Sequence, residues 1–223
     1  MSTLQDDRIA RCLDAYRSNK HVFSAFAESI VRAFQLEPTL IGSNPPIVHS
    51  MRYRLKDESH LADKIRRKET DKGVSINQDN LFNTITDLAG VRVLHLYQRQ
   101  FSEIDKFIRR QIVNKEWFLL EKPIAYYWDP DSTEYFKTFD LKLKIKPSHY
   151  TSIHYVIKPR RSSIAHCEIQ VRTLLEEVWG EIDHSINYPH PTDSKFTKEQ
   201  LRVLSKLVSA GSRLADSIFS LDQ

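Results

Sequence analysis

The segment AHCEIQVR, residues 165–172, decides the fold, because its side chains alternate between apolar and polar. Successive side chains of a strand point to opposite faces of a sheet. The segment therefore predicts a strand (164–172) with one apolar face and one polar face. The polar face carries His166, Glu168, Gln170 and Arg172.

The same alternation recurs in both directions along the chain. Further strands are predicted at 47–56, 90–97, 117–128, 139–146 and 150–158. Their polar faces carry Arg52, Arg54, Lys56, Arg92, Lys142, Lys144, Lys146, Tyr150, Ser152 and His154. One interpretation is a half-solvated sheet whose polar face lies in water. The other is a polyphosphate site, because a face this rich in cations repels itself unless an anion binds there.

Apolar residues at three- and four-residue steps predict helices between and around these strands. The predicted helices cover 1–36 (one or two helices), 57–72, 77–86, 101–112, 173–188 and 198–221. The expected fold is α+β: a mixed, mainly antiparallel sheet with flanking helices, extended by helices at both termini. We expect an N-terminal helical segment (1–46), a central domain (47–190) and a C-terminal helix (191–223).

Composition excludes several classes of protein. The chain has 33 Lys and Arg against 29 Asp and Glu, a net charge of +4, which is weaker than the basic stripe of a typical DNA-binding protein. Its five glycines cannot form a Walker loop or a dinucleotide fingerprint. Two distant cysteines, no signal peptide and no run of about 18 apolar residues predict a cytoplasmic protein that does not enter a membrane.

Two carboxylates interrupt the basic face. Glu168 lies mid-strand, and Asp87 precedes the strand that carries Arg92. Mg²⁺ takes one or two protein carboxylates and completes its shell with phosphate oxygens and water. The pair is therefore a candidate Mg²⁺ site, and the alternative is ordinary salt bridging, for example between Glu168 and Arg172.

Four ordered motifs resemble the synthetase domain of the RelA/SpoT family over residues 50–190. They are RLKDESHLADKIRRK (54–68), ITDLAGVR (85–92), HYTSIHY (149–155), and CEIQVRT (167–173) followed by LLEEVWGEIDHSINY (174–188). The resemblance implies a nucleotidyltransferase-like synthetase fold. It also implies a pyrophosphokinase that moves the β,γ-pyrophosphoryl group of Mg-ATP to the ribose 3′-hydroxyl of GDP or GTP, which gives ppGpp or pppGpp and AMP.

The resemblance also implies roles for individual residues. ATP would be bound by Arg54, Lys56, Ser59, Lys64 and Arg92, with the two arginines sandwiching adenine. Asp87 and Glu168 would be catalytic and would hold Mg²⁺, and Glu168 or a water it orients would take the proton of the 3′-hydroxyl. The acceptor would be bound by Tyr150, which stacks on its base, and by His154, Lys144, Lys146, Gln170 and Arg172, with Lys142 an alternative to the other lysines.

The acceptor half departs from the family pattern, which has Gly and Arg where this chain has His149 and Thr151. One alternative is therefore a toxin-like pyrophosphokinase that modifies the 3′ end of tRNA or an adenine nucleotide, together with an antitoxin partner. A second is a non-catalytic nucleotide or RNA sensor, although such a protein has little need of both Asp87 and Glu168. The apolar stripe of 198–221 is compatible with a homo-oligomer.

Overall fold

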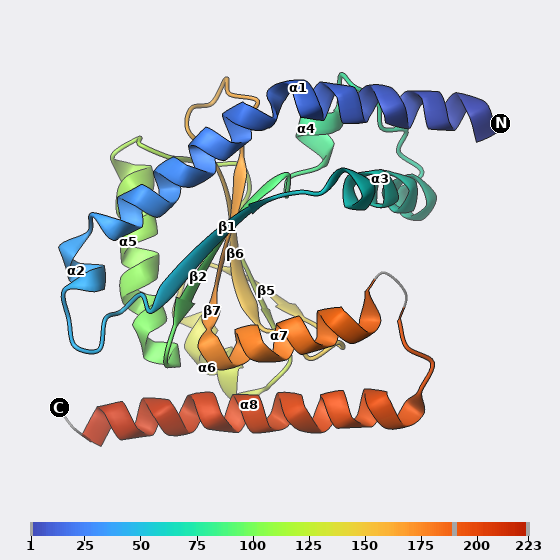
Figure 1. Ribbon diagram of the computed structural model, residues 1–223. Helices are drawn as coiled ribbons and strands as arrows, with labels where there is room; N and C mark the ends of the chain where they lie inside the picture. Colours follow the sequence, from blue (N-terminus) through green and yellow to red (C-terminus); the bar gives the residue numbers. More distant parts are fainter. Residues whose placement is uncertain (1, 189–190, 222–223) are drawn as a thin grey trace.

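Seven strands pair into one sheet in the computed structural model, which describes residues 2–188 and 191–221 (Figure 1). The strands are β1 (Ser50–Leu55), β2 (Ala89–His95), β3 (Phe118–Leu119), β4 (Ile124–Tyr127), β5 (Lys142–Ile145), β6 (Ser152–Lys158) and β7 (Cys167–Thr173). Their order is β1-β2-β7-β6-β4-β5, and β3 pairs with β6. Only the β2–β7 and β4–β5 pairs are parallel among the described strands, which confirms the predicted mixed, mainly antiparallel α+β sheet.

The helices lie on both sides of the sheet. They are α1 (Ser2–Gln35), α2 (Pro38–Ile41), α3 (Glu58–Lys72), α4 (Leu81–Thr84), the 3₁₀ turn η1 (Gln98–Gln100), α5 (Phe101–Val113), α6 (Asp131–Lys137), α7 (Leu174–Asn187) and α8 (Lys195–Leu221). Figure 1 shows α1 and α5 on one side, and α7 and α8 on the other. No helix within the described ranges is long and apolar enough to cross a membrane.

Local signals explain where the helices beside the site begin. The Asp57 side chain accepts hydrogen bonds from the backbone of Ser59 and His60, which caps α3. Gly73 ends this helix at a φ of 64°, a left-handed conformation that favours glycine. Thr173 and Glu176 form a capping box that starts α7 directly after β7.

Strand register places the predicted polar side chains together on the face covered by α7. Arg52 pairs with Arg92, Arg92 with Gln170, and Gln170 with His154 across four adjacent strands. Residues that pair directly across a sheet share a face. The opposite, apolar face packs against α1, whose Tyr16, Phe23 and Phe34 side chains are fully buried.

Two expectations for this part of the chain were wrong. The predicted strand 117–128 is two short strands, β3 and β4, interrupted around Pro123, and the helix α6 that follows was not predicted. His166 does not share the face of Glu168, because β7 begins one residue later at Cys167. Its buried ring instead packs edge-on against Phe23, with centroids 5.2 Å apart, and its Nε2 lies 2.9 Å from the Ile85 carbonyl.

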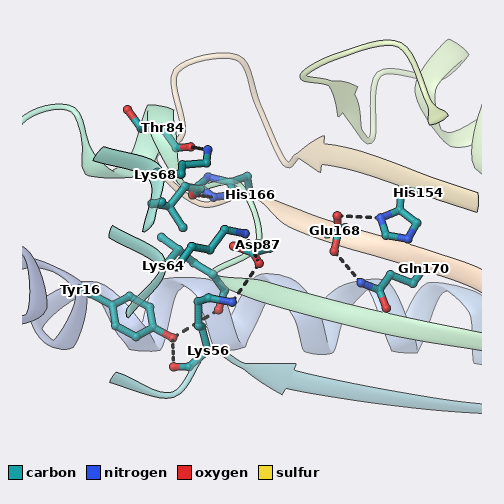
Figure 2. Close-up of polar contacts among 12 residues, drawn as sticks. Tyr16, Lys56, Lys64, Lys68, Thr84, Asp87, His154, His166, Glu168 and Gln170 are labelled. Carbon is teal, nitrogen blue, oxygen red and sulfur yellow. Dashed lines mark hydrogen bonds and ion pairs between the residues drawn. The ribbon is translucent and has the colours of Figure 1, made fainter. Parts of the chain in front are cut away.

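Tyr16 of α1 binds, from the apolar side of the sheet, the backbone beside Lys56 and Asp87 (Figure 2). Its fully buried hydroxyl donates to the Lys56 carbonyl at 2.9 Å and to the Leu88 carbonyl at 3.3 Å. Burial raises the pKa of Tyr16 to about 12, so the hydroxyl keeps its proton near neutral pH. The first carbonyl is that of Lys56 itself, and the second belongs to the residue directly after Asp87.

We expect Tyr16→Phe to lower the free energy of unfolding by about 1 kcal/mol, because it removes a buried donor from two carbonyls. Urea unfolding followed by circular dichroism measures this. The matched control is Tyr53→Phe, which removes a half-exposed hydroxyl that donates to Glu28 at 3.0 Å, and it should change the stability by much less. Equal effects of the two substitutions would contradict the prediction.

Candidate active site

Asp87 lies between two lysines that come from different elements (Figure 2). Lys56, directly after β1, places its Nζ 2.9 Å from Asp87 Oδ2, and Lys64 of α3 places its Nζ 2.5 Å from the same atom. Burial acts to raise the pKa of Asp87, but the two ammonium groups outweigh it and lower the pKa to about 2. Burial lowers the pKa of Lys56 despite the attraction of Asp87. The three groups form a charged cluster with a net charge of about +1 near neutral pH.

A cavity of about 360 Å³ opens on this cluster; we call it the lysine pocket. It is lined by Lys56, His60, Asp63, Lys64, Arg67, Asp87 and Tyr188. Ser59, predicted to bind ATP, is not among these residues. It is exposed, and its hydroxyl donates to Asp57 Oδ1 at 2.5 Å, so in this structure it belongs to the cap of α3.

Glu168 is held through both of its oxygens. Its Oε1 lies 2.9 Å from His154 Nδ1, and its Oε2 accepts from Gln170 Nε2 at 2.6 Å (Figure 2). Burial acts to raise the pKa of Glu168, and Asp87 adds to this, but His154 and Gln170 outweigh them and the pKa is lowered. Glu168 is therefore an ionised acceptor with a fixed orientation. The sequence-based alternative of a Glu168–Arg172 salt bridge is not formed.

Asp87 offers a carboxylate oxygen of the kind that Mg²⁺ takes. Asp87 Oδ1 is buried and has no hydrogen-bond partner among the described residues, so it can take a ligand. The described residues contain no cluster of three His, Cys, Asp or Glu side chains suited to a metal. A Mg²⁺ ion that shares its shell between carboxylates and substrate phosphates needs no such cluster. Asp87 and Glu168 are the residues that would hold it.

A second cavity, of about 290 Å³, lies beside the first and shares Tyr188 with it; we call it the arginine pocket. It is lined by Arg54, Arg92, Tyr150, Gln170, Arg172, Gly180, Asp183, His184, Asn187 and Tyr188. Arg54 is exposed and has no ion-pair partner within the described ranges. Arg92 pairs with Glu177 at 2.7 Å and with Glu181. Arg172 pairs with the other oxygen of Glu177 at 2.7 Å.

Helix α7 contributes residues that the sequence analysis did not identify. Glu177, Glu181 and His184 follow one another at steps of four and three, which places them on one face of α7, and Tyr188 comes directly after its last residue. Tyr188 stacks on His184 at 4.6 Å and contacts His60 of α3 edge-on at 4.8 Å. The helical spacing was a usable signal, but a solvated polar face gives the same pattern.

The acceptor-side residues surround Tyr126 of β4, which the sequence analysis also missed. Lys146 and Lys144 place their Nζ atoms 4.7 and 5.9 Å from the centre of the Tyr126 ring, and that ring meets His154 edge-on at 4.8 Å. Burial and the charge of Lys144 lower the pKa of Lys146. No contact of Lys142 with this group is found in the described residues. The structure thus gathers Lys144, Lys146 and His154 around one ring.

The loop before β6 keeps a backbone conformation that suits glycine. His149 has a φ of 60°, and its ring contacts Trp128 edge-on at 4.7 Å. A left-handed residue with a Cβ is disfavoured by roughly 1 kcal/mol. This position thus has the backbone conformation that favours glycine, although its residue is His rather than the Gly expected from the resemblance.

Residues 53–193 match the family model described as a region found in RelA / SpoT proteins. The chain belongs to the RelA/SpoT family. A curated relative, GTP pyrophosphokinase YwaC of Bacillus subtilis (strain 168), is 22% identical over an alignment of 196 residues that covers 84% of this chain and 82% of the relative. This confirms the family predicted from the four motifs.

Solved structures of this family share the fold. Small alarmone synthetase 1 from Bacillus subtilis superimposes with a TM-score of 0.68 at 19% identity, covering 97% of this chain and 98% of that chain. The same enzyme bound to its product pppGpp gives a TM-score of 0.66 at 18% identity, covering 92% and 94%. Its complex with AMPCPP also gives 0.66 at 18% identity, covering 96% and 97%.

The low pKa of Asp87 generates a prediction about stability. Its folded pKa of about 2 lies below the ordinary value of 3.8, so its contribution to stability is present above pH 3.8 and is lost as pH falls through 2. We expect Asp87→Asn to lower the free energy of unfolding by about 2 kcal/mol at pH 7. The difference from the unmodified protein should shrink below pH 4.

Urea unfolding at a series of pH values measures this difference. The exposed Asp7, which has no ion pair within the described residues, supplies the control Asp7→Asn, for which no comparable difference is expected. A destabilisation by Asp87→Asn that stays the same down to pH 2 would show that lost packing, rather than lost charge, is its cause.

Proposed function

We propose that this chain transfers the β,γ-pyrophosphoryl group of ATP to the ribose 3′-hydroxyl of GDP or GTP, yielding ppGpp or pppGpp and AMP. One observation carries the proposal. Asp87, bound by two lysines, lies close enough to Glu168 for its charge to act on the pKa of Glu168, and hydrogen bonds orient the ionised Glu168 carboxylate (Figure 2). The names of the relatives, a GTP pyrophosphokinase and a small alarmone synthetase seen with pppGpp and AMPCPP, support it.

The donor half of the reaction needs a place for a base and a place for a triphosphate. Lys56 and Lys64 would bind phosphate oxygens as point charges in the lysine pocket. Arg54 and Arg92, which lie diagonally on one sheet face, would stack on adenine in the adjoining arginine pocket. Tyr188, which lines both pockets, would lie between the adenine base and the phosphates of ATP.

The chemistry is an in-line attack of the 3′-hydroxyl on the β-phosphorus, with AMP leaving. Glu168 would accept the proton of the attacking hydroxyl, for which its ionised, oriented carboxylate is suited. Asp87 and Glu168 would hold Mg²⁺, which would neutralise charge on the transferring phosphoryl oxygens. Lys56 and Lys64 add fixed positive charge, so positioning and electrostatics supply most of the catalysis.

The acceptor half of the site would bind a nucleotide through its base and its phosphates. Tyr150 would stack on the base, a contact worth about 1–3 kcal/mol. Lys144 and Lys146 present their ammonium groups beside Tyr126 for the phosphates. His154 has both ring nitrogens engaged, so a phosphate contact would require it to give up one of its hydrogen bonds.

The proposal is tested with ATP labelled at the γ-phosphate, offered with Mg²⁺ and, in parallel, GDP, GTP, ATP and deacylated tRNA. We expect label to move to the guanosine nucleotides, with Glu168→Gln reducing the rate by about 10²- to 10⁴-fold, because the proton acceptor is lost. Glu103→Gln, at a half-exposed position of α5 that pairs with Lys106, is the control and should leave the rate unchanged.

Each other outcome replaces the proposal with a stated alternative. Label that moves to tRNA or ATP alone would identify a toxin-like pyrophosphokinase and would implicate His149 and Thr151 in acceptor choice. No transfer to any acceptor would favour a nucleotide or RNA sensor. Full activity of Glu168→Gln would remove Glu168 from its proposed role.

The adenine site is tested by Arg54→Ala. Because Arg54 is exposed and unpaired within the described residues, we expect no loss of stability but a KM for ATP raised about tenfold, as one of two stacking partners is lost. Arg52→Ala is the matched control, because Arg52 is exposed on the same face two residues earlier and does not line either pocket. Equal changes in KM would mean that general positive charge, rather than stacking, holds ATP.

A further inference from the structure

A chain of hydrogen bonds connects Tyr150 to the Glu168 carboxylate. The Tyr150 hydroxyl lies 3.0 Å from His154 Nε2, and His154 Nδ1 lies 2.9 Å from Glu168 Oε1. An ionised carboxylate can only accept, so Nδ1 must donate. The Tyr150 hydroxyl, which can donate or accept, contacts the other ring nitrogen, Nε2, so the chain runs from Tyr150 through His154 to Glu168.

The imidazole of His154 is fixed in place from several sides. The Tyr126 ring meets it edge-on at 4.8 Å and 76°, and the Tyr150 ring does so at 5.9 Å and 81°. Only 13% of its side chain is exposed. The ring cannot turn between the two tyrosines without giving up a hydrogen bond at one of its nitrogens.

The three members of the chain differ in how firmly the fold holds them. His154 and Glu168 lie on β6 and β7, which pair directly, and Gln170, which binds the second oxygen of Glu168, is the register partner of His154. Tyr150 instead lies on the loop before β6, with its ring 5.6 Å from the Arg172 guanidinium. Tyr150 is thus the member that a bound acceptor can move.

We propose that His154 is a positioning residue for Glu168, and that the Tyr150 hydroxyl is the contact through which acceptor binding controls it. This inference rests on the proposed function, in which Glu168 takes the proton and Tyr150 stacks on the acceptor base. A base that stacks on Tyr150 in its present position preserves the chain. A ligand that displaces the hydroxyl by about 1 Å breaks it, because hydrogen bonds fail beyond about 3.5 Å.

Glu168 keeps the full support of this hydrogen-bond chain only when the bound acceptor nucleotide leaves the Tyr150 hydroxyl in place. A poorly seated acceptor frees His154 Nε2, so one of the two hydrogen bonds that orient Glu168 loses its support. The site would then discriminate between acceptors in the rate of transfer and not only in binding. This gives the Tyr150 hydroxyl a role separate from that of the Tyr150 ring.

The substitution Tyr150→Phe separates the two roles, because it keeps the ring and removes the hydroxyl. We expect kcat to fall about fivefold to tenfold, the effect of one hydrogen bond, while the KM for the acceptor stays within about twofold. Acceptor binding without ATP, measured by calorimetry, should not change. Tyr53→Phe is the matched control, because it also removes a hydroxyl hydrogen bond of 3.0 Å, but on the opposite face of the sheet, and should leave kcat unchanged.

A double-mutant cycle with His154→Asn tests whether the hydroxyl acts through the imidazole. The Asn amide can replace Nδ1 as a donor to Glu168 but cannot reach Tyr150. We expect Tyr150→Phe to have no further effect on kcat in the His154→Asn background. Equal losses in both backgrounds would overturn the proposal, and so would a Tyr150→Phe variant that raises KM and weakens binding with kcat unchanged.

Failure of this inference can be told apart from failure of the proposed function. Unmodified protein that transfers no label to any acceptor overturns both. Unmodified protein that transfers label, with Glu168→Gln inactive and Tyr150→Phe as fast as the unmodified protein, overturns the role of the hydroxyl alone.

Discussion

The position of Asp87 between two lysines is the interaction on which the rest of the site depends. Two ammonium groups within hydrogen-bonding distance of the same atom repel each other, and their partial burial strengthens the repulsion. Asp87 makes the arrangement stable before any substrate arrives. The end of β1, the second turn of α3 and the loop before β2 must therefore meet at one point, which fixes how these elements can pack.

Two side chains on the apolar side of the sheet bind backbone carbonyls next to the cluster of Asp87 and its lysines. The Tyr16 hydroxyl holds the carbonyls of Lys56 and Leu88, and His166 holds the carbonyl of Ile85. A helix at the start of the chain and the residue before the seventh strand thus fix the segment that carries Asp87. Both side chains lie away from the polar face, so their contribution to the site is through the backbone.

The sequence predicted what depends on local periodicity and missed what depends on tertiary pairing. Alternation assigned Arg92 and Gln170 each to the polar face of its own strand, because strand geometry is local. It failed for His166, because nothing in the alternation marks where β7 begins. The family resemblance implies that Ser59 binds ATP, and residue spacing does not reveal that its hydroxyl also bonds to Asp57 in the cap of α3.

The missing members of the site show the same limit. Tyr126 became visible only when β4 was found beside β6, since its importance comes from neighbours that are distant in the sequence. Glu177 carries a helical polar pattern that a solvated helix would share. Glu177 pairs with both Arg92 and Arg172 because α7 packs against β2 and β7, and periodicity cannot reveal this packing.

The pairing of Arg92 with Glu177 and Glu181 has a consequence for how the two pockets respond to salt. The N–H groups of a guanidinium point outward in its plane, so carboxylates at its rim leave its flat faces open to an aromatic ring. The charge of Arg92 is already compensated there, whereas the lysine pocket keeps a net positive charge. Added electrolyte should therefore weaken the hold on phosphates much more than the hold on a base, and nucleosides should lose less affinity than nucleotides as ionic strength rises.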